Sequence, residues 1–121
     1  MPYIVHRESL EPTSTDTAGW LQFELMNAAT AAELDAELKL NILAPQMTTP
    51  RHYHTGCEHY IFIVKGRGEL LLADGAHPVA RGYMIAIDPE ERHALRNVDE
   101  ANLEYLEFFV PGRGATTIVE E

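Results

Sequence analysis

One stretch decides the fold: Arg51-His-Tyr-His-Thr-Gly-Cys-Glu-His-Tyr-Ile-Phe-Ile-Val-Lys-Gly-Arg-Gly68. Its second half is apolar on both faces and ends in a glycine-rich turn, which indicates a buried strand. In its first half, His52 and His54 are two residues apart, so in an extended chain both imidazoles leave the same face. A tight connection to the next strand would fold His59 back toward this pair. Imidazole binds iron, nickel, copper, zinc and manganese, so the three histidines predict a metal site.

Length and composition limit what can surround such a site. The 121 residues fit one domain, residues 1–121, and the single cysteine excludes an internal disulfide. No apolar run approaches the roughly 20 residues of a membrane span, and the first residues lack a signal-peptide pattern. We therefore expect a cytoplasmic protein with no membrane partner. The net charge of -10 would repel a phosphate backbone, so we expect no nucleic-acid partner.

The rest of the chain consists of short apolar segments separated by turn residues. Residues 1–19 predict an extended arm and a loop, and the alanine-rich run 28–37 predicts a loop or a short turn of helix. The pattern predicts strands over residues 20–26, 38–44, 61–64, 82–87 and 103–110, and a further strand that starts within 93–97. An Asp-Gly pair at Asp74 predicts a hairpin. Many short strands without a long helix indicate an all-β sandwich or barrel.

Two segments of this pattern resemble the paired motifs of the cupins, which are small jelly-roll barrels. The first motif contains His52 and His54, and the second runs from Gly82 to His93 and Asn97 in register. This resemblance implies an all-β fold, the cupin jelly-roll or double-stranded β-helix barrel. It covers most of the chain and implies a single cupin domain, with a barrel core over residues 38–111 behind an N-terminal arm, residues 1–19.

The sequence departs from the cupin pattern at three turn positions. Gln46 stands where a glycine usually precedes the first histidine, Asp88 where proline is usual and Glu90 where glycine is usual. None of these positions is a metal ligand in the family, so the departures leave the predicted site intact.

The third ligand of the first motif is ambiguous on spacing. Counting back from Gly66 gives His59, whereas counting forward from His54 gives Glu58. Neighbouring strand residues point to opposite faces, so only one of the two can face the site. We choose His59, because the string Glu-His-Tyr-Ile-Phe-Ile-Val-Lys-Gly resembles that of small four-histidine cupins. Glu58 remains an alternative ligand, an acid/base group or a hydrogen-bond partner of a ligand histidine.

The resemblance therefore implies one divalent metal per chain, Fe, Mn, Ni, Zn or Cu, held by His52, His54, His59 and His93. Parity predicts that Ile61 and Ile63 follow His59 inward, that Leu95 follows His93, and that Met84 and Ala86 or their immediate neighbours also point inside. Three arginines, Arg51, Arg92 and Arg96, fall on the opposite parity from the ligands, so the metal should do most of the anion binding. A second acid/base candidate is Tyr105, Glu104 or Glu107 from the last strand.

Three functional classes fit this reading. The first is a metal-dependent enzyme, dioxygenase-like or an isomerase, lyase or decarboxylase, that acts on a small anionic or enolisable molecule. The second is a metal-dependent small-molecule binding or sensor barrel without catalysis. The third is a metal-free structural barrel with vestigial histidines. We also expect a homodimer, by resemblance and because residues 103–110 carry large apolar groups on both faces.

Overall fold

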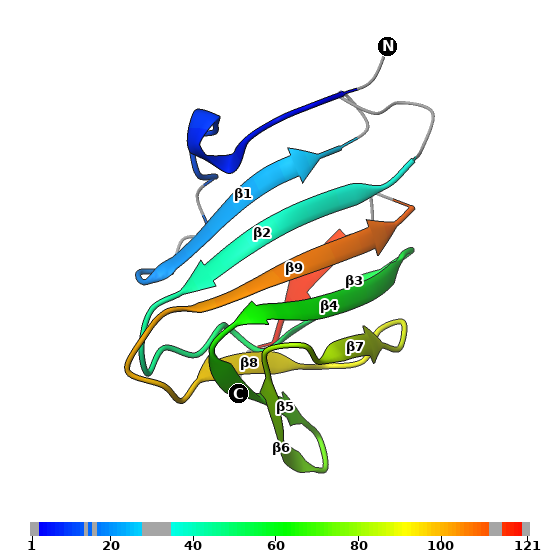
Figure 1. Ribbon diagram of the computed structural model, residues 1–121. Helices are drawn as coiled ribbons and strands as arrows, with labels where there is room; N and C mark the ends of the chain where they lie inside the picture. Colours follow the sequence, from blue (N-terminus) through cyan, green and yellow to red (C-terminus); the bar gives the residue numbers. More distant parts are fainter. Residues whose placement is uncertain (1–2, 14, 16, 28–34, 112–114, 120–121) are drawn as a thin grey trace.

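Figure 1 shows the computed structural model of the protein, which describes residues 3–13, 15, 17–27, 35–111 and 115–119. A short 3-10 helix, η1 (Arg7–Ser9), lies in the N-terminal arm. The strands are β1 (Trp20–Met26), β2 (Glu37–Leu43), β3 (His52–Thr55), β4 (Glu58–Lys65), β5 (Arg67–Leu72), β6 (Gly75–Ala80), β7 (Met84–Ile87), β8 (Ala94–Asn97), β9 (Leu103–Val110) and β10 (Ala115–Ile118). The predicted all-β fold is confirmed. Within the described residues, no helix has the length and apolar character that crossing a membrane requires.

Antiparallel strands enclose the interior of the barrel. The largest sheet has the order β1-β2-β9-β4-β7, and two smaller sheets have the orders β6-β5-β8 and β10-β3. His52 and His93 join the two smaller sheets, because each backbone N–H donates to the other residue's carbonyl oxygen at 2.9 Å. The smaller sheets thus form one wall of a jelly roll, opposite the five-stranded sheet (Figure 1).

Most predicted strands are present with small shifts of their ends. Residues 20–26 and 103–110 form strands with the predicted bounds, and the strand predicted over 38–44 covers 37–43. The strand predicted from Gly82 starts at Met84, because Gly82 lies in a turn with φ 92°. Strand β6 is the second strand of the hairpin predicted at Asp74, whereas β10 was not predicted, since its side chains are exposed. The predicted loop or helix at residues 28–37 falls largely outside the described residues, which resume at residue 35.

Two departures from the cupin motif lie in strained backbone. Gln46 has φ 64° and Glu90 has φ 62°, so both residues adopt the left-handed conformation that favours glycine. Each such residue costs on the order of 1–2 kcal/mol relative to glycine. The Gln46 amide donates to the carbonyl oxygen of Asp99 at 3.0 Å, which offsets part of this cost. The turns therefore keep the shape that the motif requires although the glycines are missing.

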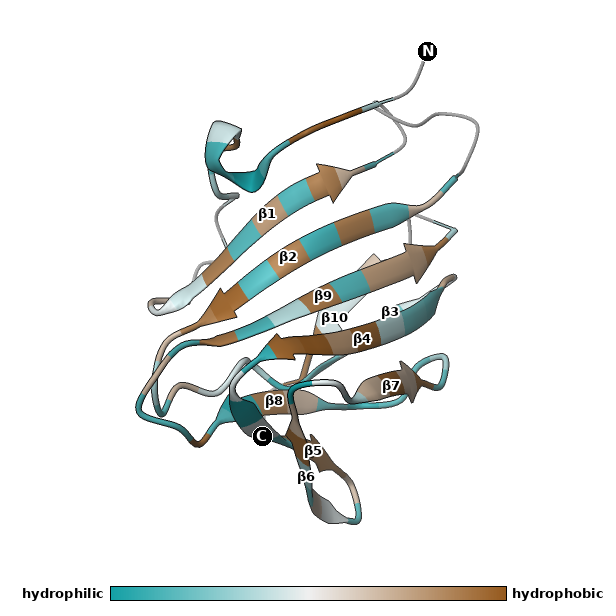
Figure 2. Cartoon of the chain, viewed as in Figure 1, coloured by the Kyte–Doolittle hydropathy of each residue, from teal (hydrophilic) through white to brown (hydrophobic). Residues whose placement is uncertain are grey.

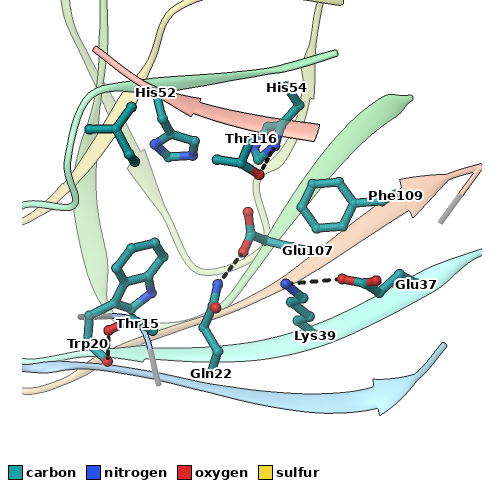
Figure 3. Close-up of a pocket in the computed structure, with 11 residues that line it drawn as sticks. Thr15, Trp20, Gln22, Glu37, Lys39, His52, His54, Glu107, Phe109 and Thr116 are labelled. Atoms are coloured by element: carbon teal, nitrogen blue, oxygen red, sulfur yellow. Dashed lines mark hydrogen bonds and ion pairs between the residues drawn. The ribbon is translucent and has the colours of Figure 1, made fainter. Parts of the chain in front are cut away.

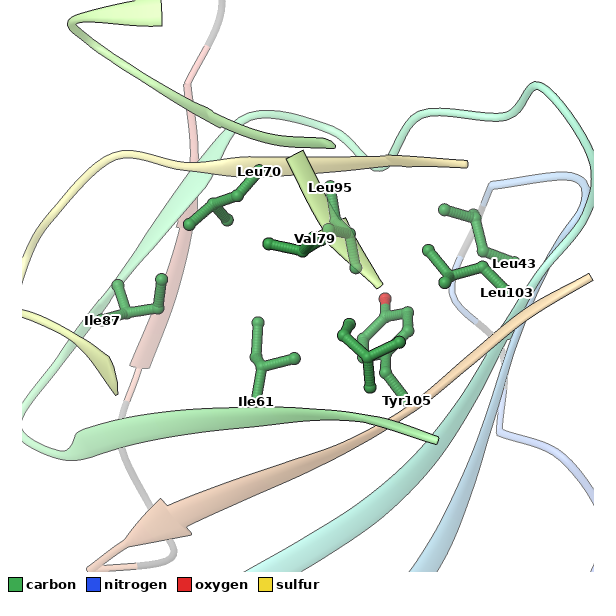
Figure 4. Close-up of a cluster of buried hydrophobic side chains, with 9 residues drawn as sticks. Leu43, Ile61, Leu70, Val79, Ile87, Leu95, Leu103 and Tyr105 are labelled. Atoms are coloured by element: carbon green, nitrogen blue, oxygen red, sulfur yellow. The ribbon is translucent and has the colours of Figure 1, made fainter. Parts of the chain in front are cut away.

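An apolar core lies between the strands of the barrel, as Figure 4 shows. Its members are Leu43, Ile61, Ile63, Leu70, Val79, Ile87, Leu95, Leu103 and Tyr105. Burying one large apolar side chain contributes about 1.5–3 kcal/mol, so this cluster is the main source of stability. The inward positions of Ile61, Ile63 and Leu95 are confirmed. On β7 the inward residues are Ile85 and Ile87, so Met84 and Ala86, the residues first expected inside, are exposed.

Strands β1 and β2 turn their polar faces toward the interior. Figure 2 shows alternating hydrophilic and hydrophobic bands along both strands. Gln22 and Lys39 line an internal pocket, whereas Leu21 is 45% exposed on the outer face of the sheet. Alternation predicted both strands, but it could not say which face is inward. The polar inner face gives the open end of the barrel a hydrophilic wall.

Candidate metal centre

The structure brings the four predicted ligand histidines together. β3 carries His52 and His54, β4 carries His59, and His93 directly precedes β8. All four side chains are buried. Ring centroids are 4.3 Å apart for His52 and His93, 4.5 Å for His54 and His59, and 5.3 Å for His59 and His93. Strand pairing positions the cluster, because the backbone bridge between His52 and His93 aligns β3 with the start of β8.

Backbone carbonyl groups fix the tautomers of two of these rings. His52 Nδ1 lies 2.7 Å from the carbonyl oxygen of Pro50, and His93 Nδ1 lies 2.8 Å from that of Glu91. A carbonyl oxygen can only accept, so each Nδ1 carries the proton and donates it. The lone pair of each neutral ring is therefore on Nε2. Metal-binding histidines commonly have this arrangement, in which the second nitrogen donates to a carbonyl or carboxylate.

Side chains orient the other two rings. His54 Nδ1 lies 3.0 Å from the Thr116 hydroxyl on β10, and His59 Nε2 donates to a Glu107 carboxylate oxygen at 2.7 Å. The opposite nitrogens, His54 Nε2 and His59 Nδ1, are buried and have no hydrogen-bond partner within the described residues, as is also true of His93 Nε2. Leaving buried polar atoms unpaired costs about 1–3 kcal/mol each. A metal ion that accepts these lone pairs removes this cost, so the residues fit the metal that the family implies.

The possible ligand atoms fall into two overlapping groups. Those of His52, His54 and His93 lie within 4.8 Å of one another, and so do those of His54, His59 and Glu107. The four predicted histidines thus belong to two clusters that share His54. The cluster that contains His59 also contains the carboxylate of Glu107. Nitrogen-rich sites with one carboxylate suit several divalent metals, so the donor set does not select one element.

Burial keeps the imidazoles in the form that binds metals. Burial, followed by the charge of His59, lowers the pKa of His54 to about 3. Burial, followed by the charge of His52, lowers the pKa of His93 to about 4, and burial also lowers the pKa of His52. These rings are neutral at pH 7, and a neutral ring has a free lone pair for a metal.

The same shifts predict that the metal-free protein loses stability in mild acid. Both pKa values lie below the ordinary value of 6.5, so stability from the neutral rings of His54 and His93 is complete above about pH 6.5. It is lost as the pH falls below about 6.5, and the loss is complete at about pH 4 for His93 and about pH 3 for His54. We expect urea unfolding to show a loss on the order of 3 kcal/mol per ring. The variant His93→Gln has no titrating group at this position, so its free energy of unfolding should fall less between pH 6.5 and 4 than that of the natural sequence. An equally large fall in the variant would contradict the assignment of this loss to His93.

Glu107 on β9 is the carboxylate of the site. Its side chain is buried, and its second oxygen, Oε1, lies 3.4 Å from the Gln22 amide nitrogen. Burial by itself would raise the pKa of Glu107, but the hydrogen bond from His59 and the charges of the neighbouring histidines outweigh burial and hold it at about 2. The sequence named Glu107 among three candidates on this strand. The structure selects it by placing Leu103, Tyr105, Glu107 and Phe109 on the inward face.

The other acid/base candidates lie away from the histidines. Glu58 is exposed and accepts a hydrogen bond from the Tyr60 hydroxyl at 2.9 Å. The register that turns His59 inward turns Glu58 outward, which speaks against Glu58 as a ligand or acid/base group. Tyr105 packs in the apolar core, where burial and then the charge of Glu107 raise its pKa well above 10. It stays protonated and is unsuited to act as a base. Glu104 lies on the outer face of β9 and pairs with Arg7 at 3.3 Å.

A pocket of about 250 Å³ opens beside the cluster (Figure 3). It is lined by Thr15, Trp20, Gln22, Glu37, Lys39, His52, His54, Glu107, Phe109, Thr116 and Ile118. Phe109 stacks on His59, with ring centroids 4.5 Å apart and an angle of 6° between planes, and so holds that ring in place. Sequence reasoning missed Gln22, Lys39 and Thr116. For Gln22 and Lys39 the available signal was the alternation along the first two strands, which does not tell which face is inward.

The comparison with protein families agrees with this geometry. Residues 40–109 match the family model of the cupin domain, which is more than half of the chain. The chain is a cupin. The predicted resemblance is therefore confirmed, and the matched residues 40–109 include the four histidines of the cluster and Glu107.

Curated relatives of this cupin come from Streptomyces. Polyketide synthase CurC from Streptomyces cyaneus is 31% identical over 101 residues, a match that covers 82% of this chain and 63% of CurC. Protein SchB from Streptomyces halstedii is 26% identical over 76 residues, which covers 63% of this chain and 55% of SchB. The chain thus spans less than two thirds of the length of either relative.

Solved structures confirm the barrel. The polyketide cyclase RemF from Streptomyces resistomycificus has a TM-score of 0.85 at 22% identity, covering 100% of this chain and 87% of RemF. A sugar phosphate isomerase of the cupin superfamily from Silicibacter pomeroyi has a TM-score of 0.81 at 18% identity, covering 98% and 82% of the two chains. Ectoine synthase from P. lautus has a TM-score of 0.78 at 19% identity, covering 97% and 89%. At these identities the likeness concerns the fold, and several of these neighbours are enzymes.

Proposed function

We propose that this cupin is a metal-dependent enzyme that acts on a small enolisable molecule, a β-dicarbonyl compound of the polyketide type. The observation that carries the proposal is the cluster of four buried imidazoles, three of which have a buried ring nitrogen without a partner in the described structure, beside a pocket that contains Glu107. The names of CurC and RemF, a polyketide synthase and a polyketide cyclase, support this substrate class.

The residues have separable parts in such a reaction. His52, His54, His59 and His93 would hold one divalent ion, which, when bound, polarises a carbonyl oxygen and stabilises developing enolate charge. Glu107 lines the pocket and takes the proton from the carbon between two carbonyl groups, so the C–H electron pair stays with the substrate. The resulting carbanion attacks a third, more distant carbonyl carbon of the same molecule and forms a C–C bond, and the C=O π pair moves to the oxygen as an alkoxide. Glu107 then returns its proton to the new alkoxide oxygen.

The other lining residues position the reacting groups. His59 and Gln22 hydrogen-bond the two oxygens of Glu107 and so limit rotation of the carboxylate. Phe109 and Ile118 form apolar parts of the wall and reduce the access of water. The pocket volume of about 250 Å³ lies below the range of drug-sized ligand sites, so we expect a compact substrate.

The test combines metal content with turnover. The purified protein, with and without added iron, manganese, nickel, zinc or copper, is incubated with a linear tetraketide acid, and cyclised product is followed by mass spectrometry. Metal-dependent cyclisation supports the proposal. Metal and ligand binding without any product would favour the alternative, a non-catalytic binding or sensor barrel. Oxygen consumption with the same substrates would instead favour a dioxygenase, and failure to take up any metal would contradict both metal-dependent readings.

We further propose that two copies of the chain associate through the outer face of the five-stranded sheet. Phe62 is 43% exposed and Met84 is 62% exposed, and the two residues face each other across β4 and β7. Phe108 lies beside Tyr60 on the same outer face, with ring centroids 6.4 Å apart. Contiguous exposed apolar surface of this kind marks an association site.

A charge on this face should disrupt the dimer. Phe62→Glu would bury an unpaired carboxylate at the interface, which costs several kcal/mol. We expect light scattering with size exclusion to give a dimer for the natural sequence and a mass near 13.6 kDa for the variant. A natural sequence that already runs as a monomer at micromolar concentration would contradict the proposal.

We propose that residues 1–121 act as one domain and that the protein works in the cytoplasm without nucleic-acid partners. The free thiol of Cys57, which is buried, is compatible with a reducing compartment. Detection of the protein in a secreted fraction would contradict this location.

A further inference from the structure

Lys39 places a positive charge inside the pocket. Among the residues that the structure describes as lining it, Lys39 carries the single permanent cation. Its side chain is only 20% exposed, and it is one of two lysines in the chain, the other being Lys65. In Figure 3 its ammonium group points from β2 into the same space as Glu107. A half-buried lysine at this position in an acidic protein calls for a role beyond solubility.

Two neighbours hold the Lys39 ammonium group in place. Glu37, two residues earlier on the same inward face of β2, has a carboxylate oxygen 3.0 Å from Nζ. The ring of Phe109 lies below Nζ, with its centroid 5.7 Å away, which is within the range of a cation–π contact. An ammonium group has three N–H donors. Glu37 uses one of them and the aromatic ring needs none, so the geometry leaves donors for a ligand.

The charges around Lys39 determine what such a ligand can be. Its cross-strand partners are Glu107 on β9 and Glu24 on β1, and Glu37 lies beside it. Of these, Glu37 and Glu107 line the pocket and would offset the two positive charges of a divalent ion held by the histidines. The two carboxylates then balance the two charges of the metal ion, and the positive charge of Lys39 is not balanced. The metal-loaded pocket therefore favours an anion. A lysine contributes to anion binding as a point charge.

We propose that Lys39 binds a carboxylate of the substrate, which is therefore a free β-keto acid rather than a neutral diketone, ester or thioester. This inference rests on the proposed function and specifies its substrate. The enolisable carbonyl lies toward the histidines and Glu107, and the carboxylate lies toward Lys39. The sequence pointed to no anion-binding side chain, since its arginines lie on the wrong parity, and the structure provides one on β2.

Trp20 provides a direct readout of binding. It is the only tryptophan in the chain and it lines the pocket, so its fluorescence reports occupancy. Zinc-loaded protein is titrated with acetoacetate and with its uncharged methyl ester. We expect acetoacetate to bind about 10-fold to 100-fold more tightly than the ester. Lys39→Met should remove this preference by weakening acetoacetate binding, with little effect on the ester, and Lys39→Arg should keep most of it.

Matched variants separate recognition from a structural role. Lys65→Met removes the same charge from an exposed position and should leave the preference unchanged. Glu37→Gln removes one negative charge from the pocket and keeps the ammonium group, so it should increase the preference for acetoacetate. If Lys39 served only to pair with Glu37, then Glu37→Gln and Lys39→Met would change binding alike, which overturns the inference. A natural sequence without any preference for acetoacetate, or a folded Lys39→Met variant that retains it, overturns it as well.

The experiment distinguishes failure of the role inferred for Lys39 from failure of the proposed function. Loss of turnover on tetraketide acids with an intact, Lys39-dependent preference for acetoacetate would remove the reaction and leave the binding site. Turnover with equal binding of acid and ester would keep the reaction and remove the role of Lys39. Circular dichroism melting of each variant, compared with the natural sequence, establishes that the proteins compared are folded.

Discussion

Replacing His93 with alanine should lower the affinity for a divalent metal by at least about 100-fold, more than changes in the surrounding hydrogen-bond partners usually cost. Its Nδ1 donates to the carbonyl oxygen of Glu91, so its Nε2 is presented in one orientation, buried and unpaired in the described structure. It also completes the group with His52 and His54. Removing it leaves that group with two nitrogens. Metal retained after dialysis, measured by inductively coupled plasma mass spectrometry, should fall from about one ion per chain to a small fraction.

Thermal melting gives a second measure of the same prediction. A ligand at 100 times its dissociation constant stabilises the folded state by about 2.7 kcal/mol, so zinc should raise the melting temperature of the natural sequence. Zinc should leave the melting temperature of His93→Ala nearly unchanged. The control is His77→Ala, because His77 is exposed, pairs with Asp74 at 2.7 Å and does not belong to the histidine cluster. If His93→Ala still retained one tightly bound ion per chain, the proposed centre would be wrong. His93→Gln tests the same ligand with a smaller change in packing.

The strands could be predicted from sequence because alternation is a local property. Residues 20–26 and 103–110 form strands with the expected bounds, and Asp74-Gly75 forms the expected hairpin between β5 and β6. The direction of each face depends on partners far away in sequence. Gln22 and Lys39 point inward because β1 and β2 flank the open end of the barrel, where the interior is a polar pocket. No pattern within either strand contains that information.

The histidine cluster could be predicted for a different reason. Its spacing repeats a motif in which strand geometry and ligand positions are linked, so His52, His54, His59 and His93 were expected together. Spacing could not decide which of Glu104, Tyr105 and Glu107 faces the site, because that depends on the register of β4 and β9, which pairs His59 with Phe109. That register places Glu107 and His59 on the same inward face. Thr116 was missed since β10 has exposed side chains and no apolar alternation.

Replacing Glu107 with glutamine should reduce product formation by about 100-fold to 10,000-fold, the range that a positioned acid/base group contributes. An amide oxygen can still accept the hydrogen bond from His59, now 2.7 Å from the carboxylate, so the fold and the ring position should survive. The amide cannot take a proton from carbon. The measurement is the rate of tetraketide cyclisation by the metal-loaded variant, with metal content determined on the same sample.

Metal content decides between the two parts that Glu107 can play. If it acts as the base, the variant keeps about one ion per chain and loses turnover. If its carboxylate is instead a ligand within the group of His54, His59 and Glu107, the variant loses metal as well, and the assignment as base is wrong. Glu104→Gln is the matched control, because Glu104 lies on the outer face of the same strand and pairs with Arg7. It should leave both metal and turnover unchanged, since a carboxylate on that face cannot reach the pocket.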